Sequence, residues 1–228
     1  VAESAGQLGI SAEDILAFTE VMIKLGTATN LSSDEGASAL AKFANITKMS
    51  SDDYGRLGST IVDLGNHFAT TERDIVEMAT RLASTGAVLG LSEAQILAIA
   101  TALSSVGIEA EAGGSAFSKL LKNIATSVAG YYKVPEIVEQ SGKDMEEWKK
   151  LALQGGLSIK GPANEIGYTT TQMHEIIDGY TMLEEMGELT GRSVEQFVKA
   201  WDANPLEALN DFINALGQVD DSDGGAIQ

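Results

Sequence analysis

Two histidines are the side chains best suited to acid-base or metal chemistry in this sequence. His174 stands four residues before Asp178, so both would lie on one face of a helix and could share a metal ion. Zinc-binding helices of the His-Glu-x-x-His type carry a second histidine where Asp178 stands, so a solvated polar helix face is the stronger interpretation. His67 lies in a Gly-Asn-His-Phe turn, for which we expect a structural role.

Carboxylate pairs are common by chance in a chain with 33 acidic residues, so a pair alone predicts no activity. Hydrolysis of a glycosidic bond needs two carboxylates across a sugar-binding cleft, usually with aromatic walls, and aromatic residues form only 6% of this chain. Glu109 and Glu111 belong to a Glu-Ala-Glu-Ala-Gly-Gly link. We interpret them as charges that favour the start of a helix, not as catalysts.

The glycines complete no phosphate-binding motif. Gly142 and Lys143 are followed by Asp144, where a P-loop has serine or threonine. The pairs at 113–114 and 155–156 match no dinucleotide fingerprint, so we predict turn or close-packing positions there.

Composition excludes several further classes of site. Cysteine is absent, which rules out disulfides, thiol nucleophiles and cysteine-based zinc sites. The net charge of −18 repels phosphates and anionic lipid headgroups, so we expect no tight nucleic-acid binding. No stretch approaches the roughly 20 apolar residues that span a bilayer. We therefore predict no catalytic, cofactor-binding or metal site, and no enzyme.

The elements that position these residues are predicted to be helices throughout. Between Asp74 and Gly86 the apolar residues follow the i, i+3, i+4, i+7, i+8 spacing of one buried helix face, and alternating strand patterns of useful length are missing. We expect an all-α fold, with Ile75, Leu82 and Phe212 among its core residues.

A repeat supports this fold class. The segments Ser11 to Gly26, Thr71 to Gly86 and Ser92 to Gly107 align without gaps. Each begins with a hydroxyl residue suited to an N-cap, and each ends in a glycine placed for a left-handed C-terminal cap.

The first and third copies extend into a second helix, which predicts a duplicated helical hairpin from Ser11 to Ile46 and from Ser92 to Ile124. The alternative is that amphipathic helices capped by serine and glycine look alike without duplication. Duplication predicts buried core pairs at Ile15 with Ile96, Met22 with Leu103, and Phe43 with Leu121.

Four parts are expected along the chain. Residues 1–129 form the repeated helical core, and residues 130–167 form a junction of short helices and a Gly/Pro loop. Residues 168–218 form a smaller C-terminal helical part, and residues 219–228 form a flexible acidic tail. A calcium loop within this tail is disfavoured, because Val219 stands at its first ligand position. Both ends look like cuts from a longer chain.

Two stretches carry a resemblance to a known family. The run LGSTIVDLGNHFATTERDIVEMATRLASTGAVLGLSEA, at 57–94, continues through ATALSSVGIEAEAGGSAFSKLL at 100–121. Together they closely resemble the central conserved region of tape measure proteins from long-tailed phages of Gram-positive hosts. The run SVEQFVKAWDANPLEALNDFINAL, at 193–216, resembles a second part of that region.

The resemblance implies an elongated, multicopy protein in the lumen of the virion tail tube, which sets tail length and leaves ahead of the genome. It implies contacts with other copies of itself, with tail tube, tail tip or distal tail and chaperone proteins, and with the host envelope on ejection. Host cytoplasm is the expected location during assembly. The alternatives are a helical adaptor of cellular origin and, less favoured, part of a cell-wall hydrolase.

Overall fold

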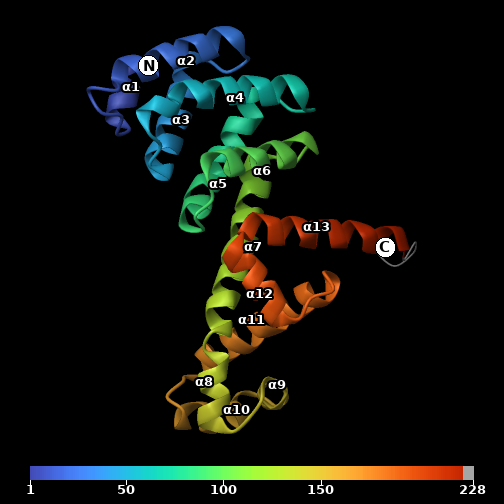
Figure 1. Cartoon of the computed structure of the whole chain (residues 1–228). Coiled ribbons are helices and arrows are strands. Elements are labelled where there is room, and N and C mark those ends of the chain that lie inside the picture. Colours follow the sequence, from blue (N-terminus) through green and yellow to red (C-terminus); the bar gives the residue numbers. More distant parts are fainter. Residues whose placement is uncertain (223–228) are drawn as a thin grey trace. The chain divides into compact units, whose positions relative to one another are not determined.

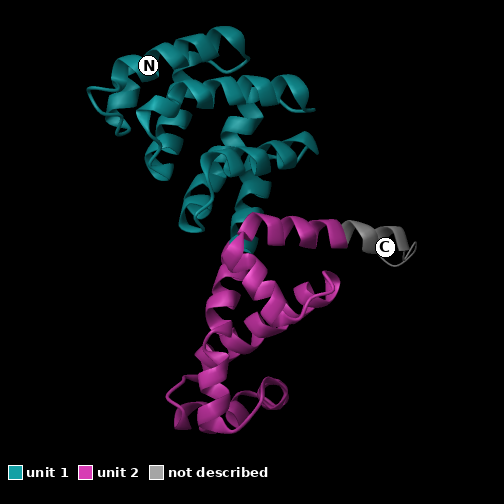
Figure 2. Cartoon of the chain, in the orientation of Figure 1, with its two compact units in different colours: residues 1–121 teal, residues 122–228 magenta. Residues whose placement is uncertain are grey.

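The computed structural model describes the backbone of residues 1–222 and the side chains of residues 1–215. All its regular elements in that range are helices, as the sequence predicts (Figure 1). The chain divides into two compact units, residues 1–121 and 122–228, and the division falls within helix α7 (Figure 2).

Unit 1 begins with α1 (Ala2–Gln7), α2 (Ile15–Ala28), α3 (Ser33–Thr47), a single 3-10 turn η1 (Ser51–Asp53) and α4 (Tyr54–His67). It continues with α5 (Glu72–Val88), α6 (Glu93–Ser105) and the first part of α7 (Ala110–Tyr131). α5 packs against α3, α4 and α6. Its predicted apolar face is buried in full, with Ile75 and Met78 both at 0% exposure and Leu82 at 2%. The periodicity therefore identified the central helix of this unit.

The N-terminal caps explain why so many helices begin where the sequence predicts. At seven helix starts a side-chain oxygen accepts the backbone N–H three residues later, at Ser32, Thr71, Ser92, Asp144, Thr169, Ser193 and Asn204. Ser11 makes the same bond to Asp14 in the turn before α2, which has no side-chain cap of its own. These bonds satisfy backbone donors that the helix itself leaves without partners. Because the same spacing recurs across both units, shared caps alone do not demonstrate duplication.

The predicted C-terminal caps are wrong at two of the three repeat glycines. Gly107 has a positive φ of 79°, as expected, but Gly26 and Gly86 lie inside α2 and α5. A Cβ at Gly26 would lie 2.9 Å from the backbone nitrogen of Ser33, and one at Gly86 would lie 2.7 Å from Ile96 Cδ1. These glycines are required for close approach of the next helix, not for a left-handed turn.

Both helix pairs of the proposed duplication are present, as α2 with α3 and α6 with α7. Met22, Phe43, Ile96 and Leu121 are buried, whereas Ile15 and Leu103 are only half-buried. Superposition of the two pairs stays a prediction.

Unit 2 contains the end of α7, followed by α8 (Val134–Ser141), α9 (Met145–Leu153) and α10 (Gly156–Glu165). The Gly/Pro loop expected in the 130–167 junction is wrong, because it is helix α10 with Pro162 inside it. Ile159 and Ala163 lie one turn apart on α10, and both are completely buried. They share a core with residues of α8, α9 and α11: Ile137, Met145, Trp148, Met173, Ile176 and Ile177.

The rest of unit 2 is α11 (Thr170–Leu189), α12 (Val194–Ala203) and α13 (Pro205–Ser222), which occupy the region predicted as a C-terminal helical part. Phe197 and Trp201 are buried, while Phe212 is only half-buried, which corrects its expected place in the core. α13 continues through residues 219–222, the start of the predicted flexible tail. The remaining tail residues, with the end of the candidate calcium loop, lie outside the described part of the chain.

Candidate functional site

The two histidines lie in different units, His67 in unit 1 and His174 in unit 2. His67 is exposed at the end of α4, where its Nδ1 lies 2.8 Å from the backbone oxygen and 3.1 Å from Oδ1 of Asp63. His174 is half-buried on α11, and Asp178 is exposed one turn later. Among the described residues, no group of three or more His, Asp or Glu side chains is arranged to hold a metal ion.

Unit 1 carries an open groove of about 960 Å³ between α3, α5 and the link from α6 to α7. Six carboxylates and two cationic side chains line it. The carboxylates come from three separate stretches, at 34–35, 74–77 and 109–111. The groove therefore has a strongly negative rim. Ala39, Ile108 and Ala110 add apolar surface to its walls.

The glycine pair Gly113–Gly114 lies in α7, next to two residues that line the groove, Arg81 and Ile108. A Cβ at Gly114 would lie 2.9 Å from Arg81 Cβ, and a Cβ at Gly113 would collide with Ile108 Cγ2. The pair thus allows the start of α7 to lie directly against α5, a close-packing role of the kind predicted. Glu109 and Glu111 flank the first residue of α7, at the helix start where we expected them, and both line the groove.

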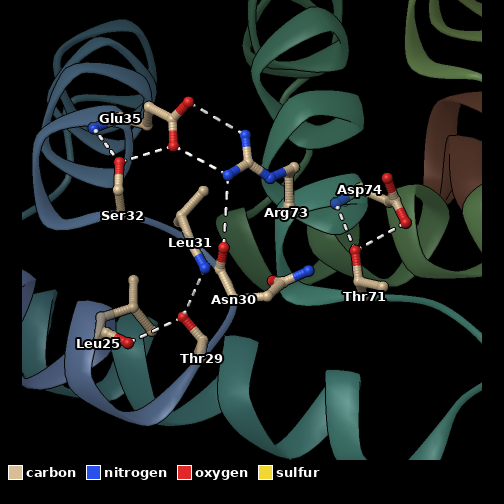
Figure 3. A network of polar contacts seen from close by, with 9 residues as sticks. All are labelled: Leu25, Thr29, Asn30, Leu31, Ser32, Glu35, Thr71, Arg73 and Asp74. Atoms are coloured by element: carbon tan, nitrogen blue, oxygen red, sulfur yellow. Dashed lines mark hydrogen bonds and ion pairs between the residues drawn. The ribbon is translucent and has the colours of Figure 1, made fainter.

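An ion-pair network fixes the N-terminal end of α3 against that of α5 (Figure 3). The Arg73 guanidinium donates to both carboxylate oxygens of Glu35, at 3.1 and 2.9 Å, and to the Asn30 carbonyl at 3.3 Å. The hydrogen bonds from Arg73, together with one from the Ser32 hydroxyl, lower the pKa of Glu35 to about 2. Sequence patterns could not reveal this pair, because its members are separated by 38 residues.

A second surface feature, on unit 2, was missed by the sequence analysis. Leu153 and Leu157 flank the turn between α9 and α10, and their exposures are 88% and 89%. Gly155 gives this turn a positive φ of 103°, which only glycine adopts without strain. The signal in the sequence was the Leu-Gln-Gly-Gly-Leu run, whose glycines we assigned to the Gly/Pro loop. We name residues 153–157 the leucine turn.

None of the described helices is both long and apolar enough to cross a membrane.

Comparison with known proteins identifies the family, which the geometry alone does not. Residues 1–223 match the family described as "Phage-related minor tail protein". The chain is also 24% identical over 159 residues to a "Probable tape measure protein" of Halomonas phage phiHAP-1. That alignment covers 66% of this chain and 17% of the relative, so the chain spans only a small part of the relative's length. No solved structure matches the chain.

The family match extends over nearly all of the sequence and agrees with the resemblance noted at 57–121 and 193–216. The chain therefore belongs to the phage-related minor tail protein family, and it is a tape-measure-like structural component of a phage tail.

Proposed function

We propose that this chain is a segment of a tape measure protein that sets tail length during assembly and then leaves the tail ahead of the DNA. The observation that carries the proposal is the family match over residues 1–223, supported by the tape measure protein of Halomonas phage phiHAP-1. The role is structural and not enzymatic.

Two physical features support this function. Helices rise by about 1.5 Å per residue and fold into units of fixed size, so a given length of sequence adds a fixed increment to the protein. The net charge of −18 also suits a protein that shares a tube with DNA, because its surface repels phosphates and will not retain the genome.

The proposed location is the lumen of the tail tube, after assembly in the host cytoplasm and before passage into the host envelope. The proposed partners are other copies of this protein, the tail tube, the tail tip or distal tail protein, and the assembly chaperone.

Tail length tests the first part of the proposal. In-frame deletion of the codons for residues 1–228 from the phage gene should give shorter tails in electron micrographs, and a tandem duplication should give longer ones. A Val88→Ala phage serves as the control, because Val88 is 84% exposed and its truncation leaves the length of the chain unchanged. Deletion and duplication phages with tails of normal length would contradict a ruler function.

Localisation tests the second part. An epitope tag on this segment should be detected in intact tails and should be absent from tails that have released their DNA. Retention of the tag in emptied tails would contradict ejection.

A further inference from the structure

The leucine turn projects from a well-packed core. Trp148, Ile159 and Ala163, which lie just before and just after the turn, are all completely buried. The exposure of Leu153 and Leu157 is therefore not caused by loose packing of the helices that carry them. Two exposed leucines four residues apart form a small apolar projection that a partner surface could cover.

The sequence from 148 to 164, which contains the leucine turn, carries lysines but no carboxylates. The lysines of that stretch are Lys149, Lys150 and Lys160. Lys149 pairs with Glu146 and Glu184. Lys150 and Lys160 are exposed, and no ion pair among the described residues involves them. The leucine turn is thus flanked in sequence by two exposed lysines, Lys150 and Lys160.

The groove of unit 1 is acidic and partly apolar, which complements the lysines and leucines of the turn. Glu77, Glu109 and Glu111 line it, and the ion pairs found in the described part of the chain include none of these three. Ile108 contributes an apolar side chain that is 39% exposed. A ligand that suits this groove carries positive charge at its edges and apolar groups at its centre.

We infer that the leucine turn of one copy docks into the acidic groove of a second copy. Leu153 and Leu157 would cover Ile108 and the neighbouring alanines, while Lys150 and Lys160 would face the carboxylates. Because the two surfaces differ, the contact is heterologous, and one docked pair leaves a free turn on one copy and a free groove on the other. Copies would therefore join head to tail, which deepens the proposed function of a protein that acts with other copies of itself in one tail.

A lipid bilayer is the other apolar surface that such a turn could enter. The net charge of −18 opposes approach to an anionic membrane and to a second copy alike, so the choice rests on local complementarity. The groove combines six carboxylates with the partly exposed side chain of Ile108, which suits the lysines and leucines of the turn. Charge complementarity therefore favours a second copy.

Sedimentation velocity of the purified chain provides the first test. We expect association that grows with protein concentration and weakens with added salt. Leu153→Ser with Leu157→Ser, and separately Glu77→Lys with Glu109→Lys, should each weaken association by about 10-fold or more, as loss of central interface contacts does. Circular dichroism should show that both double variants keep their helices.

Matched controls change the same chemistry elsewhere. Leu16→Ser with Val88→Ser removes two apolar side chains that are 80% and 84% exposed. Glu13→Lys with Asp52→Lys reverses two exposed charges of unit 1 outside the groove. Both control variants should associate like the original chain.

Mixing the two deficient variants gives the decisive measurement. The leucine variant keeps an intact groove and the groove variant keeps an intact turn, so together they should form a 1:1 dimer that does not grow further. A mixture that stays monomeric would overturn the inference, as would an original chain that is monomeric at every concentration. Leucine-dependent flotation with vesicles of anionic phospholipid, without self-association, would instead assign the turn to lipid. These outcomes are independent of tail length, so docking can fail while the ruler function stands.

Discussion

At the scale of single residues, Glu35 connects local and tertiary structure. Its backbone N–H completes the Ser32 cap of α3, and its carboxylate holds Arg73 of α5. One side chain therefore helps both to start a helix and to fix a neighbouring helix against it. The pair is partly exposed, so its contribution is screened by solvent, but its protonation can be followed by pH.

Stability should depend on Glu35 in acid. Its pKa is lowered from 4.5 to about 2 in the folded chain, because Arg73 and Ser32 donate hydrogen bonds to the carboxylate. The stabilisation is fully present above pH 4.5 and is lost as pH falls from 4.5 through 2. Denaturant unfolding over this range should show a smaller loss of stability in Glu35→Gln than in the original chain. Glu13→Gln, at an exposed carboxylate outside the network, is the control, and an equal effect of both substitutions would contradict the assignment.

Two single substitutions, at Gly26 and at Gly55, test how closely α3 approaches α2. Gly26→Ala would place a Cβ 2.9 Å from the Ser33 backbone nitrogen, so we expect a loss of about 1–3 kcal/mol in the free energy of unfolding. Gly55→Ala is the matched control, since nothing lies within 4 Å of its added Cβ. That change should stabilise the chain by up to about 1 kcal/mol, because alanine is the better helix former. Equal effects at both sites in urea titrations would show that the approach is not tight.

At the scale of elements, the sequence predicted those helices whose signals are local. α5 was predicted because its N-cap and its apolar period agree, and both depend on residues in or next to the helix. α10 was missed because Gly161 and Pro162 disfavour a helix, whereas burial of Ile159 and Ala163 in the core of unit 2 outweighs that preference. Local composition does not report burial of this kind.

The acidic groove was not predicted, because it also depends on tertiary packing that local sequence does not reveal. Glu109 and Glu111 were placed correctly at a helix start, but their proximity to α3 depends on packing through α5. The residues that line the groove are spread from Asp34 to Glu111, and no spacing rule relates such distant positions.

α5 offers a direct test of which face stabilises unit 1. Ile75→Ala and Leu82→Ala remove side chains that are 0% and 2% exposed, so each should lower the free energy of unfolding by about 2–5 kcal/mol. Val88→Ala on the same helix should change it by less than about 0.5 kcal/mol, because Val88 is 84% exposed. Thermal and urea denaturation would measure all three variants. A small loss at Ile75 or Leu82, comparable with that at Val88, would contradict their place in the core.

At the scale of the whole molecule, the charge of the chain affects how both folding stability and docking between copies depend on salt. The chain has 33 acidic and 15 basic residues, so each folded copy repels itself and other copies. Docking of the leucine turn into the groove, by contrast, depends on attraction between local charges of opposite sign. Salt screens both effects. It should strengthen folding, and a net weakening of docking would show that the local attraction exceeds the overall repulsion between copies.

Folding stability should therefore rise with salt at protein concentrations too low for association. Between about 0.01 M and about 1 M ionic strength the Debye length falls from about 30 Å to about 3 Å, which removes most long-range repulsion between carboxylates. Isolated pairs such as Arg73 with Glu35 lose attraction under the same conditions, but the net charge of −18 means that repulsion dominates the sum. Urea unfolding at several sodium chloride concentrations would measure the effect. A variant with Glu13→Gln, Asp52→Asn and Glu93→Gln carries three fewer negative charges and should respond less steeply. If stability instead falls as salt increases, local ion pairs contribute more than the overall repulsion, and the acidic surface stabilises this fold through specific contacts.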